Sequence, residues 1–452
     1  MAVTWRLGPS TPGRRVASGA SPWPGLWAVG WLLSSLVSPI TVAVAVVTPP
    51  SPSSARQEKA YGFGRSFLGL DKCNACVGTS ICKKLFKEDI RFDRWLTSRL
   101  ELPKASRQCY LGNLTDDSET WRPVVLSRLL TPERHQVSDQ SICSSAGRPP
   151  KCSIEAVLRA TPRFQSWARS HLLFPSMVQG LSAPLLRCPS QRLLDRVVRR
   201  YAEVLDVGST QMKHFSDRDK LRLLYTLAVN QHTLLLQMFP GTEGWPFPRY
   251  HGSCGRLVVW AGSRPLSSLY AAPLEQRADA AFQLLHIAQA LGSNSLRFRL
   301  YYTRATEDMF GLAEDGRVMV MDASGIGVID LQEGFLPDAL TSPANQSTRD
   351  VFSCLSGSCD RPPPCSTVRH SQSFSLLCRN VLPRLLLPAG DLRSPHLPSQ
   401  VARDLDTCAD ATRTDVAVTR AANSLMDILR SMRPCSPHYP YRYPECIYND
   451  RF

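Results

Sequence analysis

Several catalytic signatures are missing from this sequence. It contains no G-x-S-x-G elbow of serine hydrolases, no H-E-x-x-H motif of zinc proteases and no EF-hand calcium loop. It also has no zinc-finger pattern, no RNA-binding motif and no long basic run, which argues against nucleic acid as a partner despite a net charge of +15. The positive charge is dispersed, and we expect it to favour acidic surfaces such as sulfated glycans.

Cysteine is absent from the first 72 residues, and acidic residues are absent from the first 24. The arginines of this acid-free stretch precede an apolar run over residues 25–47, which contains Ala43-Val44-Ala45 near its end. A positively charged stretch, an apolar stretch and then small residues that fit a cleavage site are typical of a signal peptide. We therefore expect a secreted chain that is not an integral membrane protein. A type II signal anchor that holds the chain in the ER or Golgi lumen is the alternative.

All 15 cysteines follow the apolar run. In an oxidising compartment such a set predicts structural disulfides, and the odd number leaves at least one thiol free or paired with another chain. The nearest pair, Cys73 and Cys76, could instead be a redox pair or half a zinc site, although no second ligand pair follows at suitable spacing. The disulfide candidates are Cys73, Cys76, Cys82, Cys109, Cys143, Cys152, Cys188, Cys254, Cys354, Cys359, Cys365, Cys378, Cys408, Cys435 and Cys446.

Two acceptor sequences for N-glycosylation agree with this compartment. They begin at Asn113 and Asn345, each in a polar stretch where a surface loop is expected. We therefore predict a glycoprotein.

The hydrophobic pattern predicts helices over residues 192–205, 217–230, 274–291 and 417–433, with Ser190 and Ser216 as caps of the first two. Apolar runs predict buried strands over residues 234–239 and 255–260. A hairpin is expected from residues 309–312 and 317–321 around Asp315-Gly316, and Asp322 follows at once. The order strand, strand, long helix, loop, hairpin, aspartate is typical of the middle of a protein-kinase fold.

Five strings carry a resemblance to a known family, namely residues 67–76, 188–196, 243–246, 254–256 and 441–444. Through them the sequence resembles the divergent protein kinase domain family over nearly everything after residue 60. The resemblance implies an α+β, protein-kinase-like bilobal fold, with a small strand-containing N-lobe, a helical C-lobe and disulfide-rich extensions.

The expected organisation has four parts. Residues 1–45 form the signal peptide and residues 46–60 a Pro/Ser-rich linker. Residues 61–260 form a cysteine-rich region with the kinase-like N-lobe, and residues 261–452 form the C-lobe with a disulfide-tied tail.

The kinase pattern then locates four polar parts of a phosphoryl-transfer site. A kinase places its catalytic base about eighteen residues before the metal-binding aspartate and a metal-binding asparagine about five residues after the base. Counted from Asp322, these positions hold Arg304 and Met309, while Ser127 stands where the strand lysine is expected. Asp322 is retained, either for residual metal or nucleotide binding or only as a turn residue.

These substitutions predict a pseudokinase, because a guanidinium accepts no proton and a thioether is a poor magnesium ligand. We expect no cofactor, no phosphoryl transfer and an extracellular or lumenal signalling role with a protein partner of unknown identity. The first alternative is an active atypical kinase that uses Glu307, Asp308 or Asp315 as the base. The second is a purely structural module with an occluded cleft.

Overall fold

The computed structural model describes residues 65, 67–76, 81–92, 109–115, 120–205, 211–334, 350–356, 363–387 and 397–434. The expected signal peptide and linker lie outside the described residues, as does Asn345. Three of the candidate cysteines lie outside them as well, namely Cys359, Cys435 and Cys446.

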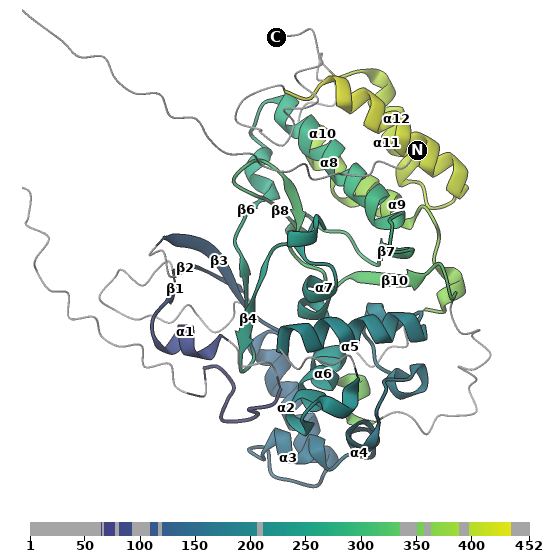
Figure 1. Cartoon of the computed structure of the whole chain (residues 1–452). Helices are drawn as coiled ribbons and strands as arrows, with labels where there is room; N and C mark the ends of the chain where they lie inside the picture. The colour runs from purple at the N-terminus through teal and green to yellow at the C-terminus, as the bar shows by residue number, and fades with distance from the viewer. Residues whose placement is uncertain are drawn as a thin grey trace, which may run out of the picture. The chain divides into compact units, whose positions relative to one another are not determined.

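An antiparallel sheet of five strands, with the order β1-β2-β3-β5-β4, forms the first part of the fold (Figure 1). The second strand alternates buried with less buried side chains, whereas the fourth in this order is buried along nearly all of its length. Buried side chains of the sheet join an apolar cluster that includes Tyr110, Leu126 and Val259. The strands are β1 Ile90–Phe92, β2 Cys109–Thr115, β3 Trp121–Arg128, β4 Tyr250–Cys254 and β5 Leu257–Ala261.

Asn113 lies inside this sheet and not in the surface loop that its sequon led us to expect. It is half-buried on β2, opposite Arg91 of β1 and Pro123 of β3. The surface-loop expectation is wrong because Leu114, which is buried, continues the period-two pattern that begins at Tyr110. Glycosylation at Asn113 stays a prediction.

A long helical insertion separates β3 from β4. The predicted helices at 192–205 and 217–230 are confirmed, and the hydroxyls of Ser190 and Ser216 accept hydrogen bonds from the backbone N–H groups of Leu193 and Asp219. The six helices of the insertion are α2 Pro132–Ser145, α3 Ile154–Arg159, α4 Pro162–Arg169, α5 Gln191–Leu205, α6 Asp217–Val229 and α7 His232–Met238.

The strand predicted over residues 234–239 is wrong, because this segment forms helix α7. Every residue of α7 is buried, so it has no polar face from which a helical period could be recognised. A short apolar run of this length fits a buried strand and a buried helix equally well.

The second part of the fold begins after β5, where the predicted helix at 274–291 is confirmed. The predicted hairpin is also confirmed, with Gly316 in the left-handed region at φ +83°. One strand, β7, lies where only a loop was expected, and it pairs antiparallel with β10. The elements here are β6 Arg264–Pro265, α8 Leu274–Gly292, β7 Phe298–Tyr302, β8 Phe310–Leu312, β9 Val318–Val320 and β10 Ile326–Asp330.

Four more helices pack with α8 into the helical part of the fold (Figure 1). The helix predicted over residues 417–433 is confirmed as α12, whose buried leucines and alanines face α8 and α11. The four are α9 Gln372–Asn380, α10 Leu382–Leu386, α11 Ser399–Ala409 and α12 Asp415–Ser431.

Disulfides connect several of these elements. Those between Cys82 and Cys254 and between Cys188 and Cys365 span 172 and 177 residues, so each restricts a long stretch of the unfolded chain. Cys354 is also disulfide-bonded. The other described pairs are Cys73–Cys76, Cys143–Cys152 and Cys378–Cys408.

Cys109 is an exception among the disulfide candidates, because it is a free thiol. Its Sγ lies 3.4 Å from Oγ of Ser127 on the paired strand β3. Within the part of the chain that the structure describes, no other sulfur pairs with it, so the expectation of a disulfide here is wrong.

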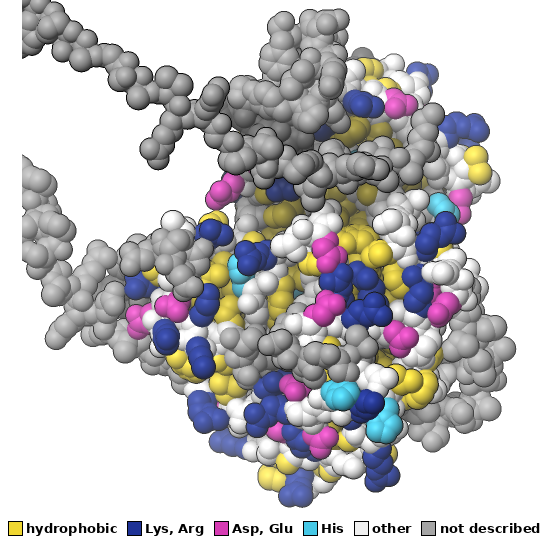
Figure 2. Space-filling view, viewed as in Figure 1, with side chains coloured by type: hydrophobic (Ala, Val, Ile, Leu, Met, Phe, Trp, Pro, Cys, Tyr) yellow, Lys and Arg dark blue, Asp and Glu magenta, His cyan; other side chains and the backbone are white. Residues whose placement is uncertain are grey.

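Charged side chains are spread over the surface. On the face in Figure 2, lysines and arginines lie apart from one another, many beside acidic side chains, and do not gather into one patch. Among the described residues, no helix combines the length and apolar character that a membrane span needs.

A buried ion pair joins α5 to the end of β10. The side chain of Asp330 is fully buried, and its carboxylate accepts hydrogen bonds from the Arg192 guanidinium at 2.9 Å and the Ser190 hydroxyl at 2.8 Å. Burial by itself raises the pKa of Asp330, but Arg192, the backbone N–H of Gln332 and Ser190 outweigh it and lower the pKa to about 2.

We predict an acid dependence of stability from this carboxylate. A depressed pKa stabilises the fold above the unfolded pKa, and that stabilisation is lost as the pH falls through the folded pKa of about 2. At 1.36 kcal/mol per unit, the contribution is about 2 kcal/mol. Urea unfolding of wild type should therefore weaken between pH 4 and pH 2 by about 2 kcal/mol more than unfolding of Asp330→Asn. Equal losses in the two proteins would contradict the assignment.

Candidate functional site

A cavity of about 930 Å³ lies where the sheet, the helical insertion and the hairpin loops meet. One wall comes from β2, β3 and β5, including Ser127 and Trp260. The α6–α7 junction forms a second wall. The loops after β7 and β9 supply Arg304 and Asp322, so three of the four predicted site residues line one cleft.

Ser127 lies on β3, the strand that was expected to carry the kinase lysine. It is buried, its hydroxyl donates to the carbonyl of Arg128 at 3.0 Å, and it lies opposite Cys109. Arg128 is the next residue and also lines the cleft. The strand therefore places a small hydroxyl, and no ammonium, at this point of the wall.

Arg304 and Asp322 form an ion pair at the mouth of the cleft. The guanidinium Nη2 lies 2.6 Å from Oδ2 of Asp322 and donates to the hydroxyl of Ser324 at 2.7 Å. The second carboxylate oxygen, Oδ1, accepts the backbone N–H of Ser324 at 2.8 Å. Both oxygens of Asp322 thus have donors from this chain.

Electrostatics keeps Asp322 ionised. Burial by itself raises its pKa, but His232, Arg304 and the hydrogen bonds from Ser324 together lower it. Burial also lowers the pKa of His232, whose Nδ1 accepts the backbone N–H of Ala323 at 3.0 Å. The ring of His232 is therefore neutral at pH 7, and Arg304 supplies the permanent positive charge next to Asp322.

Met309 does not reach the cleft, contrary to the expectation that it would stand at a metal-binding position. Its side chain is fully buried, and its carbonyl accepts the backbone N–H of Met321 at 2.8 Å. Neighbouring Asp308 lines the cavity instead. Met309 is the last residue of a 3-10 turn and Asp308 precedes it, so the two side chains point in different directions.

The other two alternative acids already have partners. Glu307 accepts hydrogen bonds from Tyr270 and from Arg384, the latter at 2.8 Å. Asp315 pairs with Arg317 in the hairpin turn and does not line the cavity. Asp308 is therefore the one of the three acids that lies among the described cavity residues.

The α6–α7 junction was not recognised from the sequence. The buried amide of Gln231 donates to the carbonyls of Ala323 and Ile326 at 3.3 and 2.6 Å and accepts the N–H of Leu185 at 2.6 Å. His232, interpreted as an isolated histidine, packs against Trp260 with ring centroids 4.5 Å apart. No local pattern could reveal these contacts, because the partners of Gln231 lie 46, 92 and 95 residues away in the sequence.

These residues do not fit the magnesium site of a kinase. Mg²⁺ requires oxygen ligands, but one carboxylate oxygen of Asp322 is paired with Arg304 and the thioether of Met309 is in the core. Within the described part of the chain, no group of three or more His, Cys, Asp or Glu side chains is placed to hold a metal ion.

Replacing Arg304 by leucine should raise the pKa of Asp322, because the variant lacks the adjacent positive charge that favours the carboxylate. The measurement is a carboxyl-carbon NMR titration of both proteins. Arg317→Leu is the matched control, since it removes a guanidinium that pairs with Asp315 and should leave the pKa of Asp322 unchanged. An unchanged Asp322 titration in Arg304→Leu would disprove the pair.

Known proteins share this sequence over most of its length. A family model described as the protein-kinase domain of FAM69 matches residues 224–411. Human divergent protein kinase domain 2B is 50% identical over 432 residues, which cover 94% of this chain and 97% of that protein. The mouse protein of the same name is 49% identical, over 96% of this chain and 100% of that protein.

A second group of relatives is less similar. Human divergent protein kinase domain 2A is 38% identical over 76% of this chain and 83% of that protein. A solved structure of an Rv3197–erythromycin complex from Mycobacterium tuberculosis is 14% identical over 71% of each chain, with a TM-score of 0.22, which is too low to add to the argument. The family-model match and the identity to the 2B proteins together show that this chain, with its α+β kinase-like fold and its disulfides, belongs to the divergent protein kinase domain family.

Proposed function

We propose that this protein is a pseudokinase of the secretory pathway, which acts by binding a protein partner and transfers no phosphate. The observation that carries the proposal is the 2.6 Å ion pair between Arg304 and Asp322 in the cleft. A guanidinium stands at the position of the catalytic base and occupies an oxygen that a metal would need. A kinase-like fold alone would not decide activity, so the argument rests on these side chains.

The open cleft is compatible with a binding role. The described residues surround a cavity of about 930 Å³ and so do not themselves fill it. This disfavours a module whose cleft is occluded by its own side chains. The free thiol of Cys109 and the hydroxyl of Ser127 lie in the same wall.

An atypical kinase is the second candidate, and one observation favours it. Asp308 is exposed, lines the cleft and is a carboxylate that could accept a proton from a substrate hydroxyl. It lies fourteen positions before Asp322, which differs from the usual kinase spacing of about eighteen.

A transfer assay separates the two candidates. Purified full-length protein is incubated with γ-labelled ATP, magnesium or manganese, and general acceptor proteins. We expect no incorporation above background for wild type, Asp308→Ala and Asp322→Ala alike, because no side chain completes the site. Transfer by wild type that falls at least about a hundredfold in Asp308→Ala would establish the atypical kinase and refute the pseudokinase.

The compartment is supported by the chemistry of the cysteines. Five described disulfides, two of them between distant parts of the chain, are typical of proteins that fold in an oxidising environment. The charged and apolar N-terminal segment is the corresponding targeting signal.

Expression in mammalian cells tests this proposed compartment. We expect the C-terminally tagged chain in the medium, with a mass that falls on treatment with an N-glycosidase because Asn345 or Asn113 carries a glycan. Asn345→Gln and Asn113→Gln assign the shift to a sequon. A chain that stays wholly inside the cells but still responds to the glycosidase would indicate the lumenal signal anchor. A chain that lacks both export and glycans would refute the proposed compartment.

A further inference from the structure

A second cavity, of about 410 Å³, lies apart from the cleft, between the loop of residues 67–72, helix α2 and the turn that follows α2. It shares only Arg128 with the residues that line the cleft. Neither the kinase-like chemistry nor the family resemblance accounts for this cavity.

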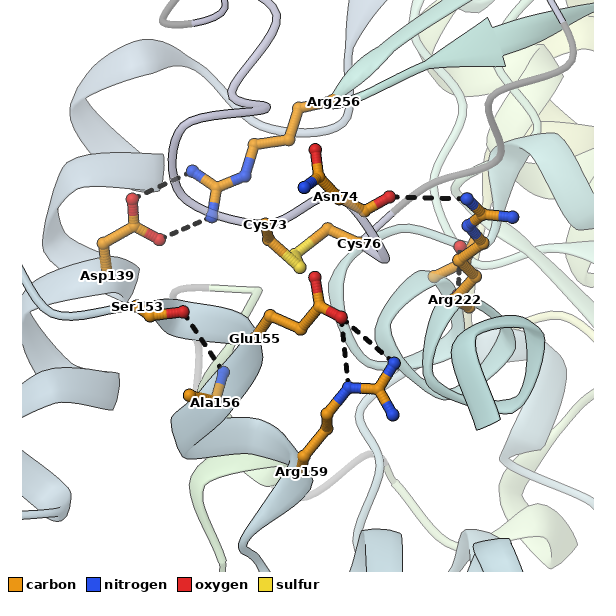
Figure 3. Close-up of a disulfide and its surroundings, with 11 residues drawn as sticks. Cys73, Asn74, Cys76, Asp139, Ser153, Glu155, Ala156, Arg159, Arg222 and Arg256 are labelled. Atoms are coloured by element: carbon orange, nitrogen blue, oxygen red, sulfur yellow. Dashed lines mark hydrogen bonds and ion pairs between the residues drawn. A yellow bond between two sulfur atoms is a disulfide. The ribbon is translucent and has the colours of Figure 1, made fainter. Parts of the chain in front are cut away.

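Its walls are held rigidly. The Cys73–Cys76 disulfide closes the loop on one side, and the Cys143–Cys152 disulfide ties the turn on the other (Figure 3 shows the first of these). The side chain of Arg256 passes so close to Gly69 that a Cβ added to this glycine would lie 2.7 Å from Cδ of Arg256. The guanidinium of Arg256 also forms an ion pair with Asp139 of α2 through two hydrogen bonds, of 2.6 and 2.9 Å. Both side chains of this pair are nearly buried, and together they form a neutral floor (Figure 3).

The remaining charges of the cavity are mainly positive. Lys72 comes from the loop and Lys151 from the turn, and neither ammonium has a hydrogen-bond or ion-pair partner among the residues that the structure describes. Arg128 adds a third cation, stacked 4.8 Å from the ring centroid of Phe67. Asp71 is the one acid of the lining outside the Arg256–Asp139 pair.

The positive charges around this cavity also act on His135, which lies in its wall. Burial, Arg256 and Arg128 lower its pKa well below the usual value, so the ring is neutral. Its Nε2 accepts the backbone N–H of Leu130 at 3.2 Å, which places the ring proton on Nδ1. Within the described part of the chain, this buried N–H in the cavity wall has no acceptor. The ammonium groups of Lys72 and Lys151, which have no partner among the described residues, favour a ligand that is rich in oxygen acceptors.

The other side chains of the lining indicate which kind of molecule carries those oxygens. Gln136 and Gln140 of α2 contribute amides, and Asp71 contributes a carboxylate, which suit the donor and acceptor character of sugar hydroxyls. The apolar contribution is one phenylalanine ring and two proline rings, and among the described residues no aliphatic side chain lines the cavity. A lipid or an apolar peptide segment would lack complementary surface here.

We propose that this pocket binds a sulfated saccharide unit, with Lys72 and Lys151 on the sulfate and the α2 amides on the sugar hydroxyls. The cavity volume is within the range of about 300–1,000 Å³ that small-ligand pockets occupy. Residues 1–45 carry three arginines and no acid, so the chain without them has a net charge of +12 (15 − 3), which assists the approach of a polyanionic glycan. This inference goes beyond the pseudokinase proposal and does not depend on it, because the cleft plays no part in the binding.

The test uses the purified full-length protein and a short heparin-derived oligosaccharide, with affinity measured by calorimetry at physiological salt. Lys72→Gln combined with Lys151→Gln should weaken binding at least about tenfold, since each ammonium makes a charge-assisted contact with the sulfate. Lys84→Gln combined with Lys213→Gln removes the same charge from exposed lysines outside the pocket and should change affinity less than about threefold. Gln136→Trp, which fills the pocket from α2, should also abolish most binding.

Three results would overturn the inference. Equal losses in the two double variants would mean that the whole surface attracts the polyanion without a pocket. Equally tight binding of a fully desulfated oligosaccharide would exclude the sulfate contact. Equally tight, lysine-dependent binding of an acidic peptide of matched charge would assign the pocket to acidic proteins and not to glycans. Thermal unfolding of each variant verifies that it is folded. The ATP transfer assay tests the pseudokinase proposal, and its result does not bear on the binding of the saccharide.

Discussion

The buried side chain of Gln231 is the contact on which the cleft depends. Its amide donates to the backbone carbonyls of Ala323 and Ile326, which both follow Asp322, and accepts the N–H of Leu185 in the helical insertion. Asn230, the residue before it, donates to the carbonyl of Leu129 at the end of β3. One junction therefore joins the sheet, the insertion and the loop that carries Asp322. Because backbone groups in a buried loop need partners, this junction determines where Asp322 stands.

Covalent bonds reinforce the same arrangement from a distance. The disulfide from Cys82 to Cys254 fixes helix α1, Cys82–Phe86, to β4, and that from Cys188 to Cys365 ties the segment before α5 to the segment before α9. The first joins parts of the chain that the helical insertion separates, and the second ties the insertion itself to the helical part of the fold. Closing such long loops removes much of the freedom of the unfolded chain. This rigid frame holds both the cleft and the second pocket in defined positions.

Sequence reasoning succeeded where the signal was local. The hairpin around Gly316 and the caps at Ser190 and Ser216 follow from turn chemistry and from the first hydrogen bonds of a helix, both of which act over a few residues. Counting back from Asp322 also placed Arg304 in the cleft. The same count failed for Met309, because a single position along a 3-10 turn decides whether a side chain faces the cavity or the core.

By itself, the sequence determined four helices, the hairpin with its aspartate and the abundance of cysteine, since these rest on periodicity, turn residues and composition, and its resemblance to a known family implied the class of the fold. The tertiary structure alone decided which cysteines pair, that Cys109 stays a thiol, that residues 234–239 are helical and that Lys72 and Lys151 face one pocket. The physical reason is distance along the chain. Local rules select conformations over a few residues, whereas pairing and burial depend on segments that meet only when the whole chain has folded.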